Sequence, residues 1–224
     1  MADAVETLLG LLRDRYSCRA FRPDPVPGDV ISRIVEAAGR APSWCNAQPW
    51  HVTVTQAAQT EAFRHALSDT AKAQAPAPDL PWPDSYPGAC GERRRTCGYQ
   101  LYDAVGIARD DRDARTEQSM RNFALFDAPH VAIVQSEAAL GPYGAMDTGG
   151  FVTAFMLAAR AHGVDTIAQA SVTAYAPMIR AHFELPETRL ILCAISFGYG
   201  DPDHPANRFR TERAGLDEIL DLRG

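Results

Sequence analysis

Apolar residues recur at helical spacing in several stretches of this chain. Near the start, Val5, Leu8, Leu9 and Leu12 recur every three or four positions, which predicts a helix ending close to Arg13. The same periodicity predicts further helices, with a polar side on the later ones, over 29–38, 57–69, 90–109 and 113–123. Alternating or continuous apolar runs predict strands over 50–55, 130–135, 164–169 and 190–197, with Pro177 early in a helix between the last two.

The segment 147–162 is the most apolar predicted helix. Residues 151–159 include Phe151, Phe155, Met156 and Leu157, so that nearly every face of the helix is apolar. A helix that is apolar on all sides has to be buried on all sides. In a chain of this size a subunit interface is an economical way to bury it.

Two other stretches predict irregular structure. Five prolines lie between positions 76 and 87, together with Trp82 and Tyr86, and no regular element tolerates that density of proline. We interpret the region of about 72–120 as a lid or cap. After Gly200, prolines and a basic tail predict an extended C-terminal arm. No break divides the chain, so residues 1–224 are expected to form a single domain.

Composition narrows the function classes. The 224 residues suffice for one sizeable core, and a formal charge of −6 argues against nucleic acid as a main partner. The longest strongly apolar run, 149–159, is too short to cross a bilayer. The five cysteines are odd in number and lack zinc-ligand spacing, and the histidines show no metal motif. We see no apolar signal segment at the start of the chain. We therefore expect a cytoplasmic protein with reduced thiols, no bound metal and no membrane contact.

A short arginine motif offers a phosphate site. Arg15, Ser17 and Arg19 alternate, so an extended backbone projects all three to one side. Two guanidiniums flanking a hydroxyl suit a phosphate dianion, since each charge-assisted hydrogen bond contributes roughly 1.5–3 kcal/mol. A solvated basic turn is the alternative interpretation. A second basic cluster that includes Arg210 and Arg213 favours the phosphate site, because both clusters could meet at one anion.

A second motif covers residues 41–50. Small and amide-bearing side chains lie between Pro42 and Pro49, which suits close backbone approach to a polar ring, while Gln48 could hold the loop together. Trp44 could narrow a pocket or could simply pack. Cys45 has no histidine obviously paired with it, so a nucleophilic role is not expected.

Both motifs resemble the opening of the FMN-dependent nitroreductase family, which begins with Arg-x-Ser-x-Arg-x-Phe and continues with Ala-Pro-Ser-x-x-Asn-x-Gln-Pro-Trp. Residues 125–130, 163–169 and 209–218 resemble later family segments. The resemblance implies an α+β fold with a mixed central sheet flanked by helices. It also implies an intertwined homodimer with FMN at the subunit interface.

The resemblance also implies a set of site residues. The implied cofactor-binding residues are Arg15, Tyr16, Ser17, Arg19, Pro42, Ser43, Asn46, Gln169, Ala170, Ser171, Arg210 and Arg213. The aromatic residues proposed to face the substrate are Trp44, Trp82, Tyr86 and Phe126. Arg64, in the predicted helix 57–69, is expected to be a surface arginine that could serve as a control for the phosphate-binding arginines.

We interpret the chain as an FMN-dependent oxidoreductase. It is expected to take hydride from NAD(P)H and to reduce aromatic nitro compounds or quinone-like acceptors by a ping-pong mechanism. The proline-rich cap resembles that of nitrobenzoate-type reductases. Gly198 to Gly200 is not a dinucleotide fingerprint, since no helix is predicted after it. Three alternatives stay open: an FMN-dependent dehydrogenase or oxidase of a biosynthetic substrate, a flavin-cleaving relative, and a non-catalytic module that binds a phosphorylated ligand.

Overall fold

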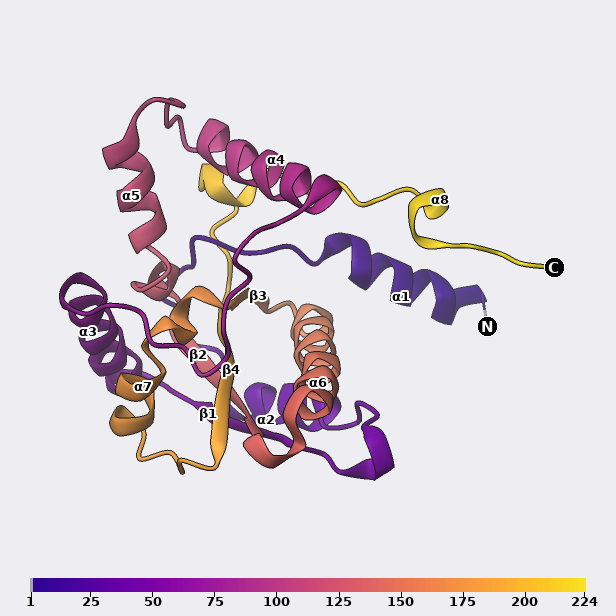
Figure 1. Ribbon diagram of the computed structural model, residues 1–224, viewed down its shortest axis with the longest axis horizontal. Coiled ribbons are helices and arrows are strands. Elements are labelled where there is room, and N and C mark those ends of the chain that lie inside the picture. The colour runs from indigo at the N-terminus through magenta and orange to yellow at the C-terminus, as the bar shows by residue number, and fades with distance from the viewer. Residues whose placement is uncertain (1) are drawn as a thin grey trace.

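A central sheet and the helices on its two faces organise this computed structural model, which describes residues 2–224 (Figure 1). The strands are β1 (Trp50–Val54), β2 (His130–Glu137), β3 (Asp165–Gln169) and β4 (Arg189–Gly198). The helices are α1 (Ala2–Asp14), α2 (Gly28–Ala38), α3 (Ala58–Ala73), α4 (Gly88–Ala104), α5 (Arg112–Met120), α6 (Gly141–Ala161), α7 (Ala176–His182) and α8 (Leu216–Ile219). Short 3-10 segments include η1 (Trp44–Asn46), η2 (Leu125–Asp127), η4 (Ser171–Tyr175) and η5 (Pro205–Asn207).

The strand order is β1-β2-β4-β3, and all three neighbouring pairs are antiparallel. The α+β class is confirmed, but the expected mixed sheet needs a correction. Among the residues described, the one parallel pairing is an isolated bridge between Ser17 and Thr166. The reason is that the segment carrying Ser17 touches edge strand β3 at one position only and does not become a strand. This single bridge still matters, because it attaches the arginine motif to the sheet.

Two hydrophobic cores lie on opposite faces of the sheet, because successive strand residues point to opposite sides. Ile195 of β4 packs with α2 and α6, whereas the preceding Ala194 packs on the side of α3 and α7 (Figure 1). The first core includes Ile34, Ala132, Phe151, Phe155 and Phe197. The second core includes Phe63, Leu67, Val131, Ile133 and Ile179.

Helix α6 begins earlier than its sequence pattern predicts. It starts at Gly141 rather than at Asp147, with Pro142 in its first turn. A proline is tolerated there because the first amides of a helix have no intrahelical acceptor. In the single chain the helix is not buried on all sides. Its residues Phe151, Phe155 and Ala159 are buried against the sheet, but an outward stripe stays exposed, formed by Tyr143, Met146, Gly149, Gly150 and Thr153.

The proline-rich segment 74–87 contains no helix or strand, as its composition predicts. Its first half is held against the sheet. The Asp79 carboxylate accepts hydrogen bonds from Arg180 Nη2 at 2.7 Å and from the amide of Ile191 at 2.8 Å. The second half carries exposed aromatic side chains, Trp82 and Tyr86. Anchoring by Asp79 therefore leaves only the second half able to act as a lid.

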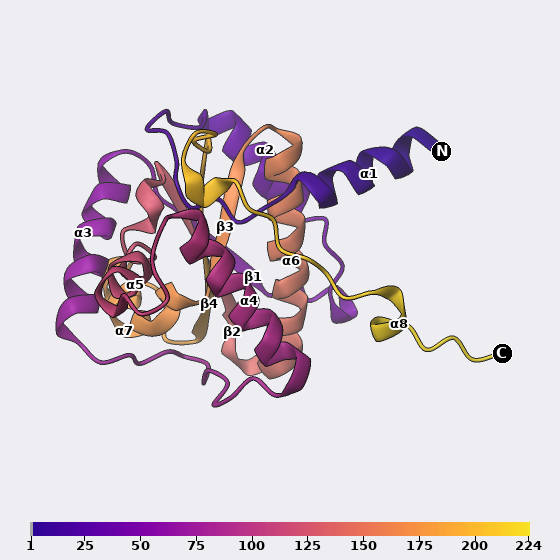
Figure 2. The ribbon, with the colours of Figure 1, turned by 90° about the horizontal axis from the view of Figure 1, so that it is seen from above.

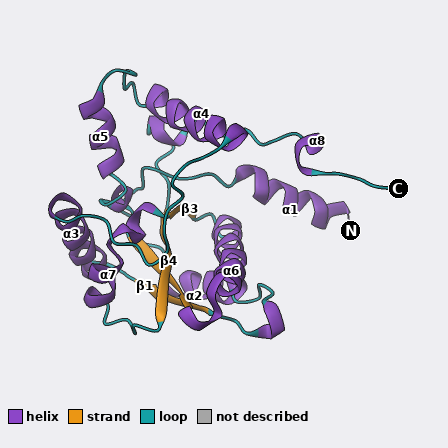
Figure 3. Ribbon diagram, in the orientation of Figure 1, coloured by secondary structure: helices purple, strands orange, loops and turns teal. Residues whose placement is uncertain are grey.

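Both ends of the chain extend away from the sheet in the same direction. Figure 2 shows α1 and the end of the C-terminal arm leaving the same side of the body, and Figure 3 shows that the arm is loop apart from η5 and α8. These ends are rich in exposed apolar residues, which are Val5, Leu8 and Leu12 on α1 and Leu216, Ile219 and Leu222 on the arm. None of the helices in residues 2–224 has the length and apolar character that crossing a bilayer demands.

A buried histidine ties the segment before α2 to the sheet. Nε2 of His130 accepts a hydrogen bond from the amide of Val26 at 2.9 Å, and its Nδ1 lies 3.1 Å from the carbonyl oxygen of Thr55. Since Nε2 accepts, Nδ1 carries the proton and donates to Thr55, which is the neutral tautomer. The ring is 1% exposed and stacks on Phe197. Burial lowers the pKa of His130 below its ordinary value of 6.5.

We expect the free energy of unfolding to fall on acidification because of His130. Below the ordinary histidine pKa the unfolded chain takes up a proton that the folded chain refuses, so stability present above that pKa is lost as pH falls. The His130→Gln variant removes this group. Its unfolding free energy, from urea titrations between about pH 7 and pH 5, should vary less with pH than that of the parent. Equal slopes in the two proteins would contradict this role.

Candidate functional site

The arginine motif leaves α1 as an extended segment attached to β3. The amide of Cys18 donates to the carbonyl of Thr166 at 3.0 Å, and the Cys18 side chain is fully buried. Alternation along the segment then places Arg15, Ser17 and Arg19 on the opposite side from Cys18. All three line the same cleft, as the sequence predicts.

This cleft, which we call the arginine cleft, has a volume of about 510 Å³. It lies between the end of α1, the arginine motif, Cys97 of α4 and the start of the C-terminal arm. Five guanidiniums line it, those of Arg13, Arg15, Arg19, Arg210 and Arg213. Within residues 2–224 no carboxylate side chain lines the cleft and none of the five arginines forms an ion pair. A cleft of this composition attracts an anion.

Two arginines of the cleft have a pKa below the usual range. Burial and the nearby Arg213 guanidinium lower the pKa of Arg15 below its usual range. Burial also lowers the pKa of Arg19. Both shifts mean that the positive charge is less favourable here than in water, and an anion placed between the guanidiniums would reverse that penalty. The N-terminal and C-terminal basic clusters therefore meet at one place, as the sequence predicts.

Tyr16 supports the cleft from behind. The Arg210 guanidinium lies over the Tyr16 ring, 4.1 Å from its centroid. Burial raises the pKa of the Tyr16 hydroxyl, which points toward Gly200 rather than into the cleft. Burial likewise raises the pKa of the Cys18 thiol to about 12, so this cysteine is an inert packing residue.

A second cleft, which we call the ring cleft, continues from the first. It has a volume of about 280 Å³ and shares Ser17 and Arg19 with the arginine cleft. Its floor is the end of β3 and the turn into η4, where Gln169, Ala170 and Ser171 line it. Its other walls come from α4, α5 and the segment after α5, through Leu101, Tyr102, Gln118, Ser119, Asn122 and Phe126.

The side chain of Gln169 is fully engaged. Its Nε2 donates to the carbonyl of Asn122 at 2.9 Å, and its Oε1 accepts from the Ser196 hydroxyl at 2.6 Å. The hydroxyl of Ser171 donates to Oδ1 of Asn122 at 3.0 Å. Contacts from this turn to a ligand therefore fall to backbone amides, which are free of intrahelical partners where a helix begins.

Phe126 lies under the ring cleft but is only 1% exposed, so it is a floor residue rather than an aromatic face offered to a substrate. It belongs to a turn in which Leu125, Phe126 and Asp127 all have positive φ, at 55°, 51° and 62°. Left-handed backbone costs roughly 1–2 kcal/mol for each residue with a Cβ. Such a turn persists only when its surroundings hold it in place.

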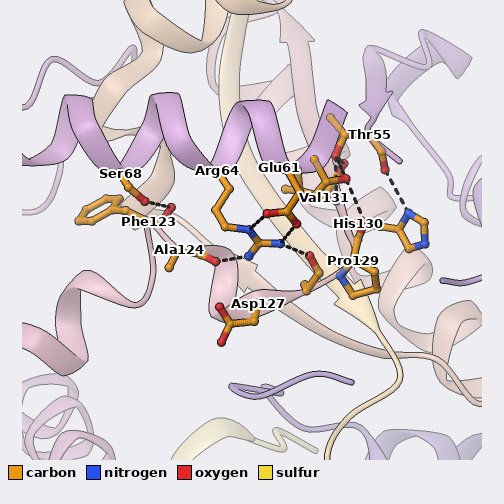
Figure 4. A network of polar contacts seen from close by, with 12 residues as sticks. Thr55, Glu61, Arg64, Ser68, Phe123, Ala124, Asp127, Pro129, His130 and Val131 are labelled. Carbon is orange, nitrogen blue, oxygen red and sulfur yellow. Dashed lines mark hydrogen bonds and ion pairs between the residues drawn. The ribbon is translucent and has the colours of Figure 1, made fainter. Parts of the chain in front are cut away.

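Arg64 of α3 holds that turn, and the expectation of a surface arginine is wrong (Figure 4). Its side chain is 12% exposed, its Nη1 donates to the carbonyl of Ala124, and its Nη2 donates to that of Ala128 at 2.7 Å. Glu61 accepts two further hydrogen bonds from the guanidinium. Helical periodicity could not reveal this, because the acceptors lie sixty residues away in sequence. Arg33 is the better control, since it is 56% exposed and pairs only with Asp29 on its own helix.

The second sequence motif lies elsewhere. Trp44 packs on Tyr143 with ring centroids 4.6 Å apart, and its amide donates to Asp147 of α6 at 3.0 Å. The other end of α6 is next to β3 through the Arg160–Asp165 ion pair. Thirteen residues separate Asp147 from Arg160, which is about 20 Å at the rise of an α-helix. In one chain, the loop with Pro42, Ser43 and Asn46 is therefore far from the arginine cleft.

The loop itself is well ordered by its own side chains. The Ser43 hydroxyl accepts a hydrogen bond from the amide of Gln48 at 2.9 Å, and Gln48 Nε2 donates to the carbonyl of Asn46. Cys45, Asn46 and Gln48 have positive φ. Gln48 therefore holds the loop together, as expected, while Asn46 is left exposed at its tip.

The remaining aromatic candidates also lie outside the two clefts of the single chain. Trp82 and Tyr86 are 45% and 48% exposed, and the Tyr86 ring lies under the Arg94 guanidinium of α4. Trp44 is 61% exposed beside α6. Of the four aromatic residues suggested by the sequence, only Phe126 lines either cleft, and it does so from below.

Comparison with known proteins explains why these residues share one chain. The profile of the nitroreductase family matches residues 12–199, which is most of the sequence. The chain belongs to the nitroreductase family. This membership confirms the resemblance inferred from the two motifs, and it accounts for an arginine motif and a distant Pro-Ser loop in one sequence.

Two relatives and one crystal structure illustrate the similarity of this nitroreductase-family chain. Nitroreductase NfnB of Mycolicibacterium smegmatis is 36% identical over 217 residues, covering 96% of this chain and 92% of the relative. A 4-nitrobenzoate reductase of Nocardioides sp. is 33% identical over 219 residues, covering 96% of this chain and 89% of the relative. The crystal structure of the FMN-dependent nitroreductase NfnB from Mycobacterium smegmatis in complex with NADPH has a TM-score of 0.94 at 35% identity, covering 99% of this chain and 100% of that one.

Two asparagines hold parts of this nitroreductase-family site together through contacts that the sequence does not reveal. Asn207 accepts a hydrogen bond from the amide of Arg19 at 2.8 Å and donates to the carbonyls of Ala20 and Asp201, which joins the arginine motif to the C-terminal segment. Asn122 receives the side chains of Gln169 and Ser171. In the sequence, Asn207 stands just before the basic cluster, which is the one signal that could have pointed to it. No local pattern pairs it with Arg19.

Proposed function

We propose that this protein is an FMN-dependent NAD(P)H oxidoreductase that reduces aromatic nitro compounds or quinone-like acceptors. The observation that carries this proposal is the arginine cleft, which five arginines line without a carboxylate partner, so that it suits an anion. The less charged ring cleft lies beside it. The phosphate of FMN suits the first cleft and its ring suits the second. Two similar proteins, a 4-nitrobenzoate reductase and an FMN-dependent nitroreductase in complex with NADPH, support the same function.

Named residues would hold the cofactor. Arg15, Ser17, Arg19 and Arg213 would bind the phosphate, with Arg210 and Tyr16 stacked behind them. The amides of Ala170 and Ser171, next to Gln169, would bond the polar edge of the ring and stabilise negative charge there. Pro42, Ser43 and Asn46 would reach the ring from a second copy of the chain. In their own copy the loop is bonded to Asp147, about 20 Å along α6 from the Arg160 end that pairs with β3.

The chemistry needs little from side chains. Bound FMN would supply the hydride and electron transfer between the nicotinamide and the acceptor. Within the residues described, the ring cleft is lined by no carboxylate and no histidine, so protons come from solvent. The protein contributes position and exclusion of water. Gly198 ends β4 and no helix follows it directly, so this segment does not form a dedicated nicotinamide-binding motif. The nicotinamide and the acceptor would bind the same cleft one after the other.

We propose a homodimer as the working form. The outward stripe of α6, the apolar residues of α1 and the extended C-terminal arm all need a partner surface, and helix α1 is in contact with helix α6. A second copy would cover these surfaces and bring its Pro-Ser loop to the arginine cleft. The segment 80–87, with Trp82 and Tyr86, would then act as the lid within the proposed cap region of about 72–120, and Trp44 would face the acceptor.

We also propose a cytoplasmic location. All five cysteines are free, including the exposed Cys45 and Cys90, as expected for a reducing compartment.

The phosphate assignment predicts weaker FMN binding in two variants. Arg15→Ala and Arg213→Ala should each raise the FMN dissociation constant by about tenfold or more, because each removes a charge-assisted hydrogen bond of roughly 1.5–3 kcal/mol. Quenching of flavin fluorescence during titration of the apoprotein measures this constant. Arg33→Ala, an exposed arginine paired only with Asp29, should bind FMN like the parent. Unchanged binding in both cleft variants would remove those two assignments.

The catalytic proposal predicts reduction by a nicotinamide without air. Anaerobic NADPH or NADH should bleach the yellow FMN-loaded protein, and 4-nitrobenzoate should then restore the colour. Steady-state rates at several acceptor concentrations should give parallel double-reciprocal lines, as a ping-pong mechanism requires. A yellow protein that neither nicotinamide bleaches would favour a dehydrogenase or oxidase, and a protein that takes up no FMN would favour a phosphate-binding module.

The dimer proposal predicts that charge on the uncovered apolar surfaces separates the copies. Leu8→Asp on α1 and Met146→Glu on α6 should raise the dimer dissociation constant, measured by sedimentation velocity, and should weaken FMN binding in parallel. Lys72→Glu, at an exposed position of α3, should change neither. A parent protein that sediments as a monomer and still retains FMN would contradict a site built from two copies.

A further inference from the structure

Arg64 places a charged group inside the protein without touching either cleft. Its guanidinium reaches from α3 to the carbonyls of Ala124 and Ala128, and Figure 4 shows it between Ala124 and Pro129. These two carbonyls stand on either side of the turn formed by residues 125–127. Asp127 does not pair with Arg64, since its carboxylate accepts from Arg121 Nη2 at 2.8 Å instead. Arg64 therefore recognises the backbone of the turn and not its charge.

The turn needs such a clamp. Leu125, Phe126 and Asp127 have consecutive positive φ values, and none is glycine. The backbone bonds of the turn are all local. The amides of residues 125 to 128 donate, in order, to the carbonyls of Asn122, Arg121, Ala124 and Leu125. The guanidinium joins the two residues that directly flank the turn to α3. A fork of fixed geometry is suited to this, because several donors are held in one plane. One residue further out on each side, Ser68 and Thr60 of α3 donate to the carbonyls of Phe123 and Pro129.

The turn connects Arg64 to the cofactor cleft through Phe126. This fully buried ring packs with Cys18, Phe21 and Ile167, beneath the arginine motif and edge strand β3. Cys18 lies between Ser17 and Arg19, the two residues shared by the arginine cleft and the ring cleft. A shift of Phe126 would therefore move the arginine motif, which lines both clefts, and the end of β3, which lines the ring cleft.

We propose that Arg64 is a positioning residue for cofactor binding: by clamping the left-handed turn 125–127, it fixes Phe126 under the arginine motif and so sets the spacing of Ser17 and Arg19. This proposal rests on the proposed function, since it assumes that FMN occupies the two clefts.

The first test replaces the fork by a single charge. Arg64→Lys keeps the charge near Glu61 but cannot bridge two carbonyls and a carboxylate at once. We expect an FMN dissociation constant about tenfold higher than in the parent, equivalent to about 1.4 kcal/mol, at a temperature where circular dichroism shows both proteins folded. In the apoprotein, the amides of Phe126 and Ala128 should exchange with deuterium faster. Arg33→Lys, the matched change in an exposed helical arginine, should alter neither quantity.

A second variant separates the clamp from general stability. Glycine adopts positive φ without penalty, so Asp127→Gly should relieve one of the three left-handed residues and lessen the turn's need for Arg64. The double variant Arg64→Lys/Asp127→Gly should recover part of the lost FMN affinity and of the slow exchange. An Arg64→Lys protein with parental affinity and exchange overturns the proposal, and so does a double variant as weak as Arg64→Lys. A parent that binds no FMN overturns the proposed function and the cofactor part of this proposal, while the exchange data still decide the clamp.

Discussion

The structure depends on a concentration of like charge that the protein does not neutralise by itself. Arg15, Arg19 and Arg213 line one cleft. Burial and repulsion by Arg213 lower the pKa of Arg15, and burial lowers that of Arg19. Folding pays a free-energy cost to bring them together, since repulsion between like charges disfavours the compact state. That cost is reversed when an anion binds, because charge-assisted hydrogen bonds to a phosphate are among the stronger polar interactions. The cleft is therefore a site whose stability is completed by its ligand.

The cleft is assembled from opposite ends of the chain, and the bonds that hold it are few. Ser17 is bridged to Thr166, Asn207 bonds the backbone of Arg19, and the Arg210 guanidinium stacks on Tyr16. None of these bonds is part of a regular strand ladder. The sheet supplies a rigid edge, and side chains attach the irregular segments to it. This arrangement keeps the arginine side chains of both segments on the wall of one cleft without making either segment a strand.

Features that depend on neighbouring residues were predictable from the sequence, and features set by contacts between distant segments were not. Periodicity located the helices and strands, and alternation correctly placed Arg15, Ser17 and Arg19 on one side. The mixed sheet was wrong because strand direction depends on pairing between distant segments, which periodicity does not report. Arg64 was taken for a surface residue because its two carbonyl acceptors are set by a turn on another element. The lid was only partly predictable, since Asp79 anchors its first half to β4 through contacts that proline content cannot reveal.

The separation of the two motifs along α6 has a thermodynamic consequence. The Pro-Ser loop is bonded to Asp147 at one end of the helix, and the arginine cleft lies near Arg160 at the other. If one FMN takes phosphate contacts from one copy and ring contacts from another, only the dimer holds the complete site. Ligand binding and association then share a single coupling free energy, and each strengthens the other by the same factor. FMN at a hundredfold excess over its dissociation constant would stabilise that dimer by about 2.7 kcal/mol. In the proposed dimer, the uncovered apolar surfaces and the arginines without ion-pair partners would belong to one equilibrium, in which association and cofactor binding complete the same structure.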